Sequence, residues 1–320
     1  MTTPGRTCPR RYRTQPDALA GAADVTAEII YVVGGLYGNV AALAAVQTRA
    51  EQEREAGRPA PVFVFNGDFN WFNATTDAFR AINEAVFDHW TLQGNVEAEL
   101  GAPTPGAGCG CAYPDSVSDE RVDASNRIME RLQAVARQGP DWTDALADPP
   151  LQLTAEVGSA CIGIIHSDPD RLAGWGLAVK QMPPPGTTPP NVARWFRAAE
   201  VDGFACTHTC LPHLQDFTVD GTRRLVVNNG AAGMPNFRGG RTGAITRIST
   251  QAAPFDVLYD TTLKDVHCEA VGVECTPADW LTWFEETWPP GPPAWTNYRN
   301  RLLDGPAHIR ADAIRLQRDS

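Results

Sequence analysis

The stretch EIIYVVGGLYGN, residues 28–39, joins a short apolar run to a glycine-rich end. The run EIIYVV at 28–33 is rich in β-branched and aromatic residues, which is typical of a buried strand. Residues 38–55 then carry an apolar face and stop at Gly57-Arg58-Pro59, so we expect a helix there. A strand that ends in a glycine-rich loop and leads into a helix is typical of layered α/β proteins.

The same unit recurs along the chain. Apolar runs of strand length lie at 28–33, 61–65, 151–157, 160–165, 203–206 and 224–228, with further strand candidates at 243–249, 255–259 and 266–274. Helical patterns lie at 38–55, 75–89 and 118–137, with shorter ones at 169–181 and 191–200. Early alternation of strands and helices, followed by a strand-rich second half, predicts a layered α/β protein rather than a bundle or barrel.

The length of 320 residues predicts one large domain, or one domain with an appendage. Four of the nine tryptophans lie beyond residue 276, in helical patterns broken by WPPGPPAW. We therefore expect an N-terminal extension at 1–26, a main domain at 27–275, and a helical appendage at 276–320 that packs on the core.

Composition argues against several classes of partner. The net charge is −11 and no basic run is longer than CPRRYR, so nucleic acid is not expected as a partner. No apolar run reaches the ~20 residues of a membrane-spanning helix, so no membrane partner is expected. The first residues lack the apolar segment of a secretory signal, which favours a cytoplasmic location. The eight cysteines are then expected as free thiols, and Cys109 and Cys111 lack the doubled spacing of a zinc ribbon.

Six short motifs close apolar runs and open a loop or helix. They are GGLYGN (34–39), NGDFNW (66–71), QGNVE (93–97), IIHSD (164–168), THTC (207–210) and NNGAAG (228–233). Between them they supply Asp68, Asn95, His166 and His208, a set of oxygen and nitrogen donors suited to one divalent metal. The sequence thus predicts a metal site.

The order of these motifs resembles that of the calcineurin-like metallophosphoesterases, over about residues 28–260. That family has D-x-H-G-N, G-D-x-x-D/N, G-N-H-D/E, a lone His after a strand, G-H-x-H and an N-P-G-S-type turn. The surviving positions here are Gly38-Asn39, Gly67-Asp68, Gly94-Asn95 and Asn229-Gly230. The resemblance implies a four-layer α-β-β-α sandwich of two mixed sheets packed face to face, with helices outside.

The departures from the family pattern are as specific as the matches. Gly35 stands in place of the first aspartate and Tyr37 in place of the first histidine. Val96 replaces the histidine of G-N-H, and Thr207 and Cys210 replace the glycine and the second histidine of G-H-x-H. Four of these changes remove a side chain that binds metal or acts on the substrate in relatives.

Relatives hold two metals, and the departures divide unevenly between the two sites. The resemblance implies that the first site keeps only Asp68, with Cys210 as a candidate soft ligand. It implies that the second keeps Asp68, Asn95, His166 and His208. We therefore expect a mononuclear site for one divalent metal, and manganese, iron or zinc would each suit these ligands.

The implied function is a metal-dependent hydrolase that acts on a small phosphoester or related molecule. Asn95 and Tyr37 are the candidate catalytic residues, and Asn39 and Asn229 are expected to shape the substrate pocket. The histidine that Val96 replaces is a kind of group worth ~10²–10⁴-fold in rate, so ordinary phosphomonoesterase activity is expected to be poor. The oligomeric state stays open.

Structural roles stay open for the same residues. Asp68 could cap a helix, Asn95 could serve a turn, and a lone histidine such as His166 or His208 is often a packed core residue. Tyr37 could be a packed aromatic, and Cys210 either a small buried hydrophobe or a thiolate. Asp168 and Asn229 could orient the ligand histidines.

Two other functions stay open as well. One is a pseudoenzyme that binds a metal, a nucleotide or a protein without turnover. The other is a thiolate-containing second metal site, built from Cys210 with Cys109 or Cys111, which would support chemistry other than phosphoester cleavage.

Overall fold

The apolar run of the opening stretch forms strand β2 (Ile29–Val33), in which every residue is buried. In the computed structural model, which describes residues 3–317, its alternate side chains serve two different cores. Tyr31 and Val33 face a core beneath helices, whereas Ile30 and Val32 face a second sheet. A strand buried on both faces reads as a continuous apolar run, because neither face contacts water.

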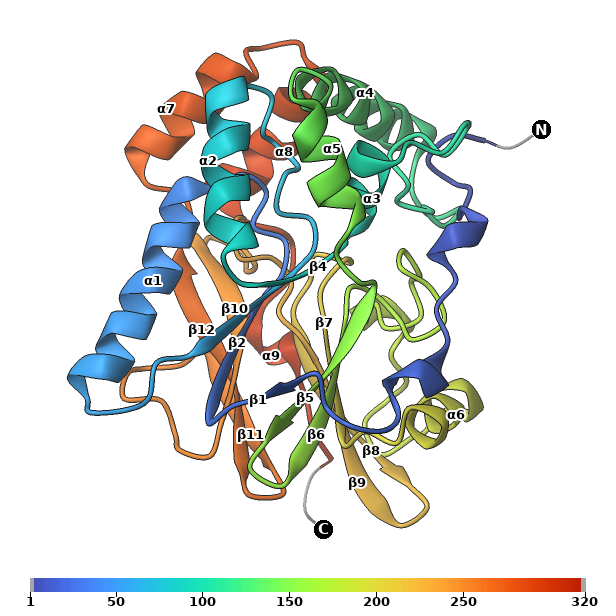
Figure 1. Ribbon diagram of the computed structural model, residues 1–320, viewed down its shortest axis with the longest axis vertical. Coiled ribbons are helices and arrows are strands. Elements are labelled where there is room, and N and C mark those ends of the chain that lie inside the picture. The colour runs from blue at the N-terminus through green and yellow to red at the C-terminus, as the bar shows by residue number, and fades with distance from the viewer. Residues whose placement is uncertain (1–2, 318–320) are drawn as a thin grey trace.

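The strands of residues 3–317 form two mixed sheets (Figure 1). One sheet has the order β11 (Tyr259–Leu263), β12 (Val266–Glu274), β10 (Thr242–Ser249), β2, β3 (Val62–Asn66), β4 (Trp90–Leu92). The other has the order β1 (Val25–Thr26), β5 (Gln152–Val157), β6 (Ala160–Ile165), β7 (Gly203–Cys206), β9 (Thr222–Asn228), β8 (His213–Val219), β13 (Ile314–Arg315).

Helices cover both outer faces. The first sheet packs against α1 (Val40–Glu55), α2 (Thr76–Phe87), α4 (Asp119–Ala136), α7 (Ala278–Thr287) and α8 (Pro293–Asp304). The second sheet packs against α6 (Pro190–Ala199), through Val192, Trp195 and Phe196. With the core between the sheets, this is the predicted four-layer α-β-β-α sandwich.

Parallel pairing gathers the motifs at one edge of the molecule. Strands β2, β3 and β4 run parallel in one sheet, and β6, β7 and β9 run parallel in the other. Each of these six strands ends where one of the six motifs begins or lies. Ligands bind outside the carboxyl ends of strands in open α/β sheets, so this edge is where a site is expected.

Most of the predicted strands and helices are present, but two predictions are wrong. Residues 169–181 form an irregular loop with only a short 3₁₀ turn at Val179–Gln181. Its backbone amides are taken by side chains, since Gly176 N donates to Asp168 and Gly174 N to Ser167. The strand predicted at 255–259 lies at 259–263 instead, because a two-residue turn that contains Lys264 (φ 54°) fixes its pairing with β12.

Short or polar elements escaped prediction. These include β1, β4, β8, β13, α3 (Asn95–Gly101) and α5 (Pro140–Ala147). Strand β4 has three residues and α3 seven, too few for a clear period, and β8 reads HLQDFTV with four polar side chains. Among the described residues, no helix is long and apolar enough to cross a membrane.

The two ends of the chain pack into the same structure as its middle. The tail forms α7 and α8 as predicted, and Trp288 donates from its indole to the Phe72 carbonyl at 3.2 Å. Near the N-terminus, Tyr12 is fully buried and donates to Glu99 at 2.6 Å. The proposed division at residues 26 and 275 stays a prediction.

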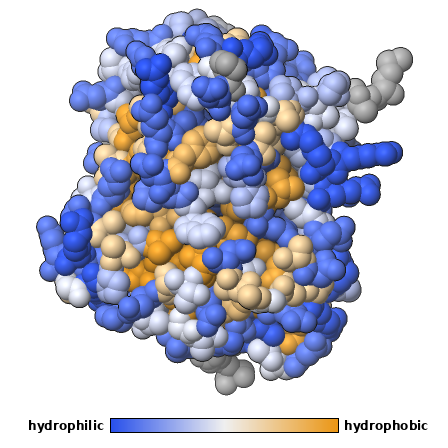
Figure 2. Space-filling model, in the orientation of Figure 1, coloured by the Kyte–Doolittle hydropathy of each residue, from blue (hydrophilic) through white to orange (hydrophobic). Residues whose placement is uncertain are grey.

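The surface is mixed rather than uniformly polar. Figure 2 shows hydrophilic residues around the periphery of one face and apolar residues across its middle. Large apolar side chains that are strongly exposed are scattered in sequence among the described residues: Val40, Trp90, Ile309 and Ile314. Such single exposures are normal for a folded protein and do not by themselves define a binding surface.

Candidate metal centre

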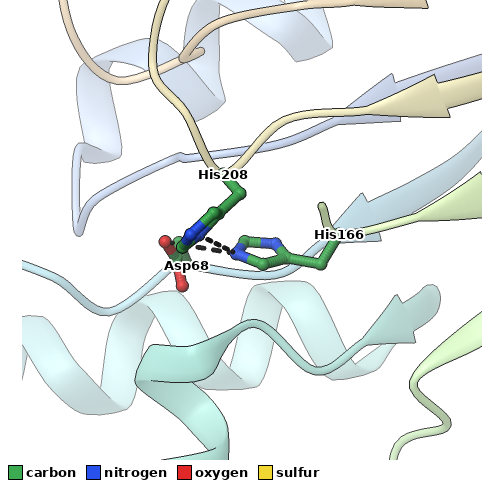
Figure 3. A group of neighbouring side chains, drawn as sticks. All are labelled: Asp68, His166 and His208. Atoms are coloured by element: carbon green, nitrogen blue, oxygen red, sulfur yellow. Dashed lines mark hydrogen bonds and ion pairs between the residues drawn. The ribbon is translucent and has the colours of Figure 1, made fainter. Parts of the chain in front are cut away.

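Three side chains from three different loops converge at the shared edge of the sheets (Figure 3). Asp68 follows β3, His166 follows β6, and His208 follows β7. His166 Nε2 lies 3.4 Å from Asp68 Oδ2 and 3.2 Å from His208 Nδ1, and all three residues are buried. Their donor atoms lie within 4.8 Å of one another, which is the spacing of a metal-ligand group.

Two glycines allow the loops to approach this closely. A Cβ atom added to Gly67 would lie 2.3 Å from Gly94 N and 2.7 Å from His166 Nδ1. A Cβ added to Gly94 would lie 2.3 Å from Asp68 Oδ1. The glycines of the G-D and G-N motifs are therefore required, because a side chain at either position would keep the two loops and the His166 ring apart.

Hydrogen bonds fix how the ligands are presented. The Nδ1 atom of His166 bonds to the Asn66 carbonyl at 2.8 Å, which leaves Nε2 directed at Asp68 and His208. The backbone amide of Val96 donates to Asp68 Oδ1 at 3.2 Å and so orients that carboxylate. A backbone partner on the second ring nitrogen is the usual way in which a metal-binding histidine is oriented.

Two buried donor atoms at the site lack a hydrogen-bond partner among residues 3–317. They are Oδ1 of Asn95 and Nε2 of His208. The amide nitrogen of Asn95 donates to the Cys109 carbonyl at 3.0 Å, so the amide is held with its oxygen free. Leaving such atoms unpaired costs free energy, and a divalent metal bound by Asp68, Asn95, His166 and His208 would remove that cost for Asn95. At His208 the nitrogen that faces His166 is Nδ1, so Nε2 is directed away from the other ligands. The donor set therefore fits the expected ion.

Burial and mutual charge set the protonation of the group. Burial lowers the pKa of His166, but the adjacent Asp68 carboxylate outweighs this and leaves the pKa of His166 above its ordinary value. Burial likewise raises the pKa of Asp68, and the two histidines outweigh it and leave the pKa low. Burial and His166 together lower the pKa of His208 to about 3, so this ring is neutral. A carboxylate beside a neutral imidazole suits metal binding.

The site is built on strained backbone. Tyr37, Asp68, His208 and Cys210 all have positive φ, at 55°, 55°, 37° and 58°. Residues with side chains seldom adopt this region, because each instance costs of order 1–3 kcal/mol and persists only where the surrounding structure enforces it. Four such residues in one place is the pattern of a functional site.

The substituted positions of the first-site pattern pack against one another. The Tyr37 hydroxyl and Cys210 Sγ lie 2.8 Å apart and share a hydrogen bond. A Cβ at Gly35 would lie 3.0–3.2 Å from the Tyr37 ring and hydroxyl, so that ring covers the position of the absent aspartate. Burial raises the pKa of both Tyr37 and Cys210, so both are protonated. Among the described residues, the metal-ligand group does not include Cys210, Cys109 or Cys111.

A small cavity of about 60 Å³ opens onto the group. Its walls are mainly aromatic and apolar, and its lining includes Tyr37, Asp68, Trp71, Asn95, Val96, Cys111, Tyr113, Trp175, His208, Cys210, Met234 and Tyr298. Binding sites for drug-sized ligands measure about 300–1,000 Å³. The cavity as it stands therefore suits a small group, and a larger substrate requires the aromatic walls to move.

The residues predicted to shape the substrate pocket, Asn39 and Asn229, make contacts within the scaffold. Asn39 caps α1 by accepting from Ala42 N and donates to the carbonyls of Gly233 and Cys275. Asn229 donates to the carbonyls of Gly34 and Ala244. Neither lines the cavity. A role in substrate binding stays a prediction for both, without support from their contacts.

The predicted orienting partners of the histidines also differ from those observed. Asp168 accepts from the amides of Gly176 and Asp170, so it organises the loop after β6 and not a ligand ring. The carbonyl of Asn66 performs that orienting role for His166. A backbone group leaves no mark in the sequence and could not have been predicted.

Glu97 is the residue at the site that sequence reasoning missed. Its buried carboxylate accepts from the amides of Asp68 at 2.6 Å and of Gly94 at 3.2 Å, and so ties two ligand loops together. Burial and the charge of Asp68 raise the pKa of Glu97 to about 7. Its position could have pointed to it, because Glu97 ends QGNVE and the family pattern G-N-H-D/E has an acidic residue at that place.

Comparison with known proteins supports the fold assignment. No protein-family model and no curated protein sequence matches the chain. A hypothetical protein of known structure from Pyrococcus horikoshii OT3 is similar, with a TM-score of 0.57 and 16% identity over 88% of this chain and 99% of that one. A metallophosphoesterase from Sphaerobacter thermophilus has a TM-score of 0.55 and 16% identity over 87% of this chain and 99% of that one. The chain therefore has the fold of the calcineurin-like metallophosphoesterases, as predicted.

Proposed function

We propose that this protein is a mononuclear metal-dependent hydrolase of a small phosphoester or related substrate. The observation that carries the proposal is the group of Asp68, His166 and His208, with Asn95 Oδ1 beside it as an unpaired buried acceptor. Similar fold and suitable donors support hydrolysis, although many functions can occupy one fold.

Different residues of the site would bind the metal, position its ligands and line the cavity. Asp68, Asn95, His166 and His208 would hold one divalent ion, which would supply a Lewis acid for a phosphoryl oxygen and lower the pKa of water. Glu97 keeps the Asp68 loop in place through the Asp68 amide. The Tyr37 hydroxyl, protonated because burial raises its pKa, lines the cavity and shares a hydrogen bond with Cys210 Sγ.

The test is a count of metal per chain, in the wild type and in His166→Ala, followed by a screen of phosphoesters. About one manganese, iron or zinc per wild-type chain, loss of the metal in the variant, and metal-dependent turnover would support the proposal. Two metals per chain would refute the mononuclear site.

A pseudoenzyme is the second candidate, and the cavity favours it. A volume of about 60 Å³, walled by Trp71, Trp175 and Tyr298, leaves little room for a substrate. This candidate predicts bound metal with no turnover of any phosphoester in the same screen. Metal-dependent turnover of any one substrate would reject it.

A further inference from the structure

Arg301 on α8 is a partly buried cation without an acidic partner. Its Nη2 donates to the Cys210 carbonyl at 2.5 Å, and its Nε is buried and unpaired. It forms no ion pair within the part of the chain that the structure describes. Its helix neighbour Arg299, in contrast, is paired with Glu285 at 2.7 Å. A guanidinium offers five N–H donors, so Arg301 keeps most of its capacity for an anion.

A second guanidinium lies nearby. Arg121, at the start of α4, is exposed and lies 5.9 Å from the ring centroid of Tyr298. Within residues 3–317 it has no carboxylate partner, since the neighbouring Asp119 is paired with Arg6 at 2.6 Å. Tyr298 lines the cavity and precedes Arg301 by three residues, so the two share one face of α8.

Both cations lie close enough to Cys210 to lower the pKa of its thiol, although neither lines the cavity itself. The carbonyl that Arg301 contacts belongs to Cys210, which stands where the resemblance places a ligand of the first metal. The side chain of Cys210 bonds to Tyr37, the second altered position. A divalent ion that is not bound there removes two positive charges and Gly35 removes one negative charge, so the two guanidiniums more than replace the positive charge that is missing.

We propose that Arg301, assisted by Arg121, forms an anion-binding site beside the metal centre that takes phosphoryl oxygens of the substrate. The guanidinium fork matches the geometry of phosphate oxygens, and the partly buried position strengthens the attraction. The identity of the anion, a phosphoryl group of the substrate, rests on the proposed function.

The experiment measures binding of inorganic phosphate to the manganese-loaded full-length protein by calorimetry. We expect Arg301→Gln to bind phosphate ~10-fold or more weakly, because a charged hydrogen bond is lost. Arg301→Lys retains the charge but not the fork, and should fall between the two. Arg299→Gln removes a paired charge from the same helix and should bind as the wild type does. Metal content should be equal in all four proteins.

If Arg301→Gln binds phosphate as tightly as the wild type, or if the wild type binds none, the proposal is wrong. Binding that depends on Arg301, without turnover of any phosphoester, would keep the anion site and reject the hydrolase. If Arg301→Gln lowers the melting temperature, the exposed Arg121→Gln variant replaces it, with an expected ~2–5-fold loss of phosphate affinity. Unchanged affinity in that variant would then overturn the proposal.

Discussion

The site has a preserved half, formed by Asp68, Asn95, His166 and His208, and an altered half, formed by Gly35, Tyr37 and Cys210. The two halves differ in whether their polar atoms have hydrogen-bond partners. In the preserved half, backbone groups orient His166 and Asp68, while Asn95 Oδ1 and His208 Nε2 keep no partner among the described residues. In the altered half, Tyr37 and Cys210 bond to each other at 2.8 Å.

The difference between the halves follows from whether each half still binds a ligand. A site that still binds a ligand must tolerate unpaired donors in its free state, which costs stability. A site that has lost its ligand is free to pair its own side chains. The preserved half has the first pattern and the altered half the second, which agrees with one metal rather than two.

The largest expected effect tests the preserved half. His208→Ala removes a ligand, and because even indirect partners of a metal are worth ~10–100-fold in affinity, we expect a loss of at least ~100-fold. Metal per chain after dialysis measures this. His308→Gln is the control, since His308 lies on the C-terminal segment and bonds to the Pro212 carbonyl. Equal metal content in both variants would show that His208 is not a metal ligand.

The converse experiment rebuilds the altered half. The triple variant Gly35→Asp, Tyr37→His, Cys210→His restores the family ligands, and metal per chain should rise from about one to about two. Gly35→Asp alone should not bind a second ion, because its Cβ would lie 3.0–3.2 Å from the Tyr37 ring. One metal in the triple variant would show that more than these side chains closes the first site.

The pH dependence of metal binding follows from the preserved half. The metal requires neutral His166, whose pKa is raised, so affinity should fall as pH falls below that pKa, by up to ~tenfold per pH unit for one displaced proton. His208, with a pKa of about 3, is already neutral and should add no proton. Calorimetry in buffers of different ionisation enthalpy counts the protons. Release of two protons would contradict this assignment.

Glu97 holds the Asp68 loop of the preserved half in position by accepting a hydrogen bond from the Asp68 amide. Glu97→Gln weakens the acceptor that holds the Asp68 amide at 2.6 Å, and metal affinity should fall ~10-fold in a chelator competition. Glu99→Gln is the matched control: Glu99 lies on the same helix, is equally buried, and bonds to Tyr12 and Arg11. That control should lower stability but not metal affinity. Similar affinities for the two variants would mean that Glu97 does not position Asp68.

The smallest effect belongs to the altered half. Tyr37→Phe removes one partly buried hydrogen bond, and we expect the free energy of unfolding in denaturant to fall by ~0.5–1.5 kcal/mol. Metal content should stay at the wild-type value, because the four proposed ligands are Asp68, Asn95, His166 and His208 and the Tyr37 hydroxyl bonds to Cys210. A loss of metal in this variant would erase the distinction between the halves.

Prediction from sequence succeeded where a long pattern repeats. The apolar runs at 28–33 and 160–165 and the helical pattern at 118–137 appear as β2, β6 and α4 within one or two residues. The loop at 169–181 has helical spacing, yet Asp168 and Ser167 compete for its backbone amides. Side-chain competition of this kind depends on three-dimensional position and weakens any local prediction.

The sequence alone determined most of the strand-and-helix order, the fold family it resembles, and Asp68, His166 and His208 as the converging group, because the glycines and ligands lie in short local motifs. Tertiary structure alone decided that Tyr37 and Cys210 pair and that Glu97 links two loops. It also decided that Tyr298 from the tail lines the cavity and that Arg301 contacts the Cys210 carbonyl. These contacts join residues up to 173 positions apart in the chain, as Tyr37 and Cys210 show. Local patterns carry no information about which distant side chains meet, since packing of the whole sandwich brings them together.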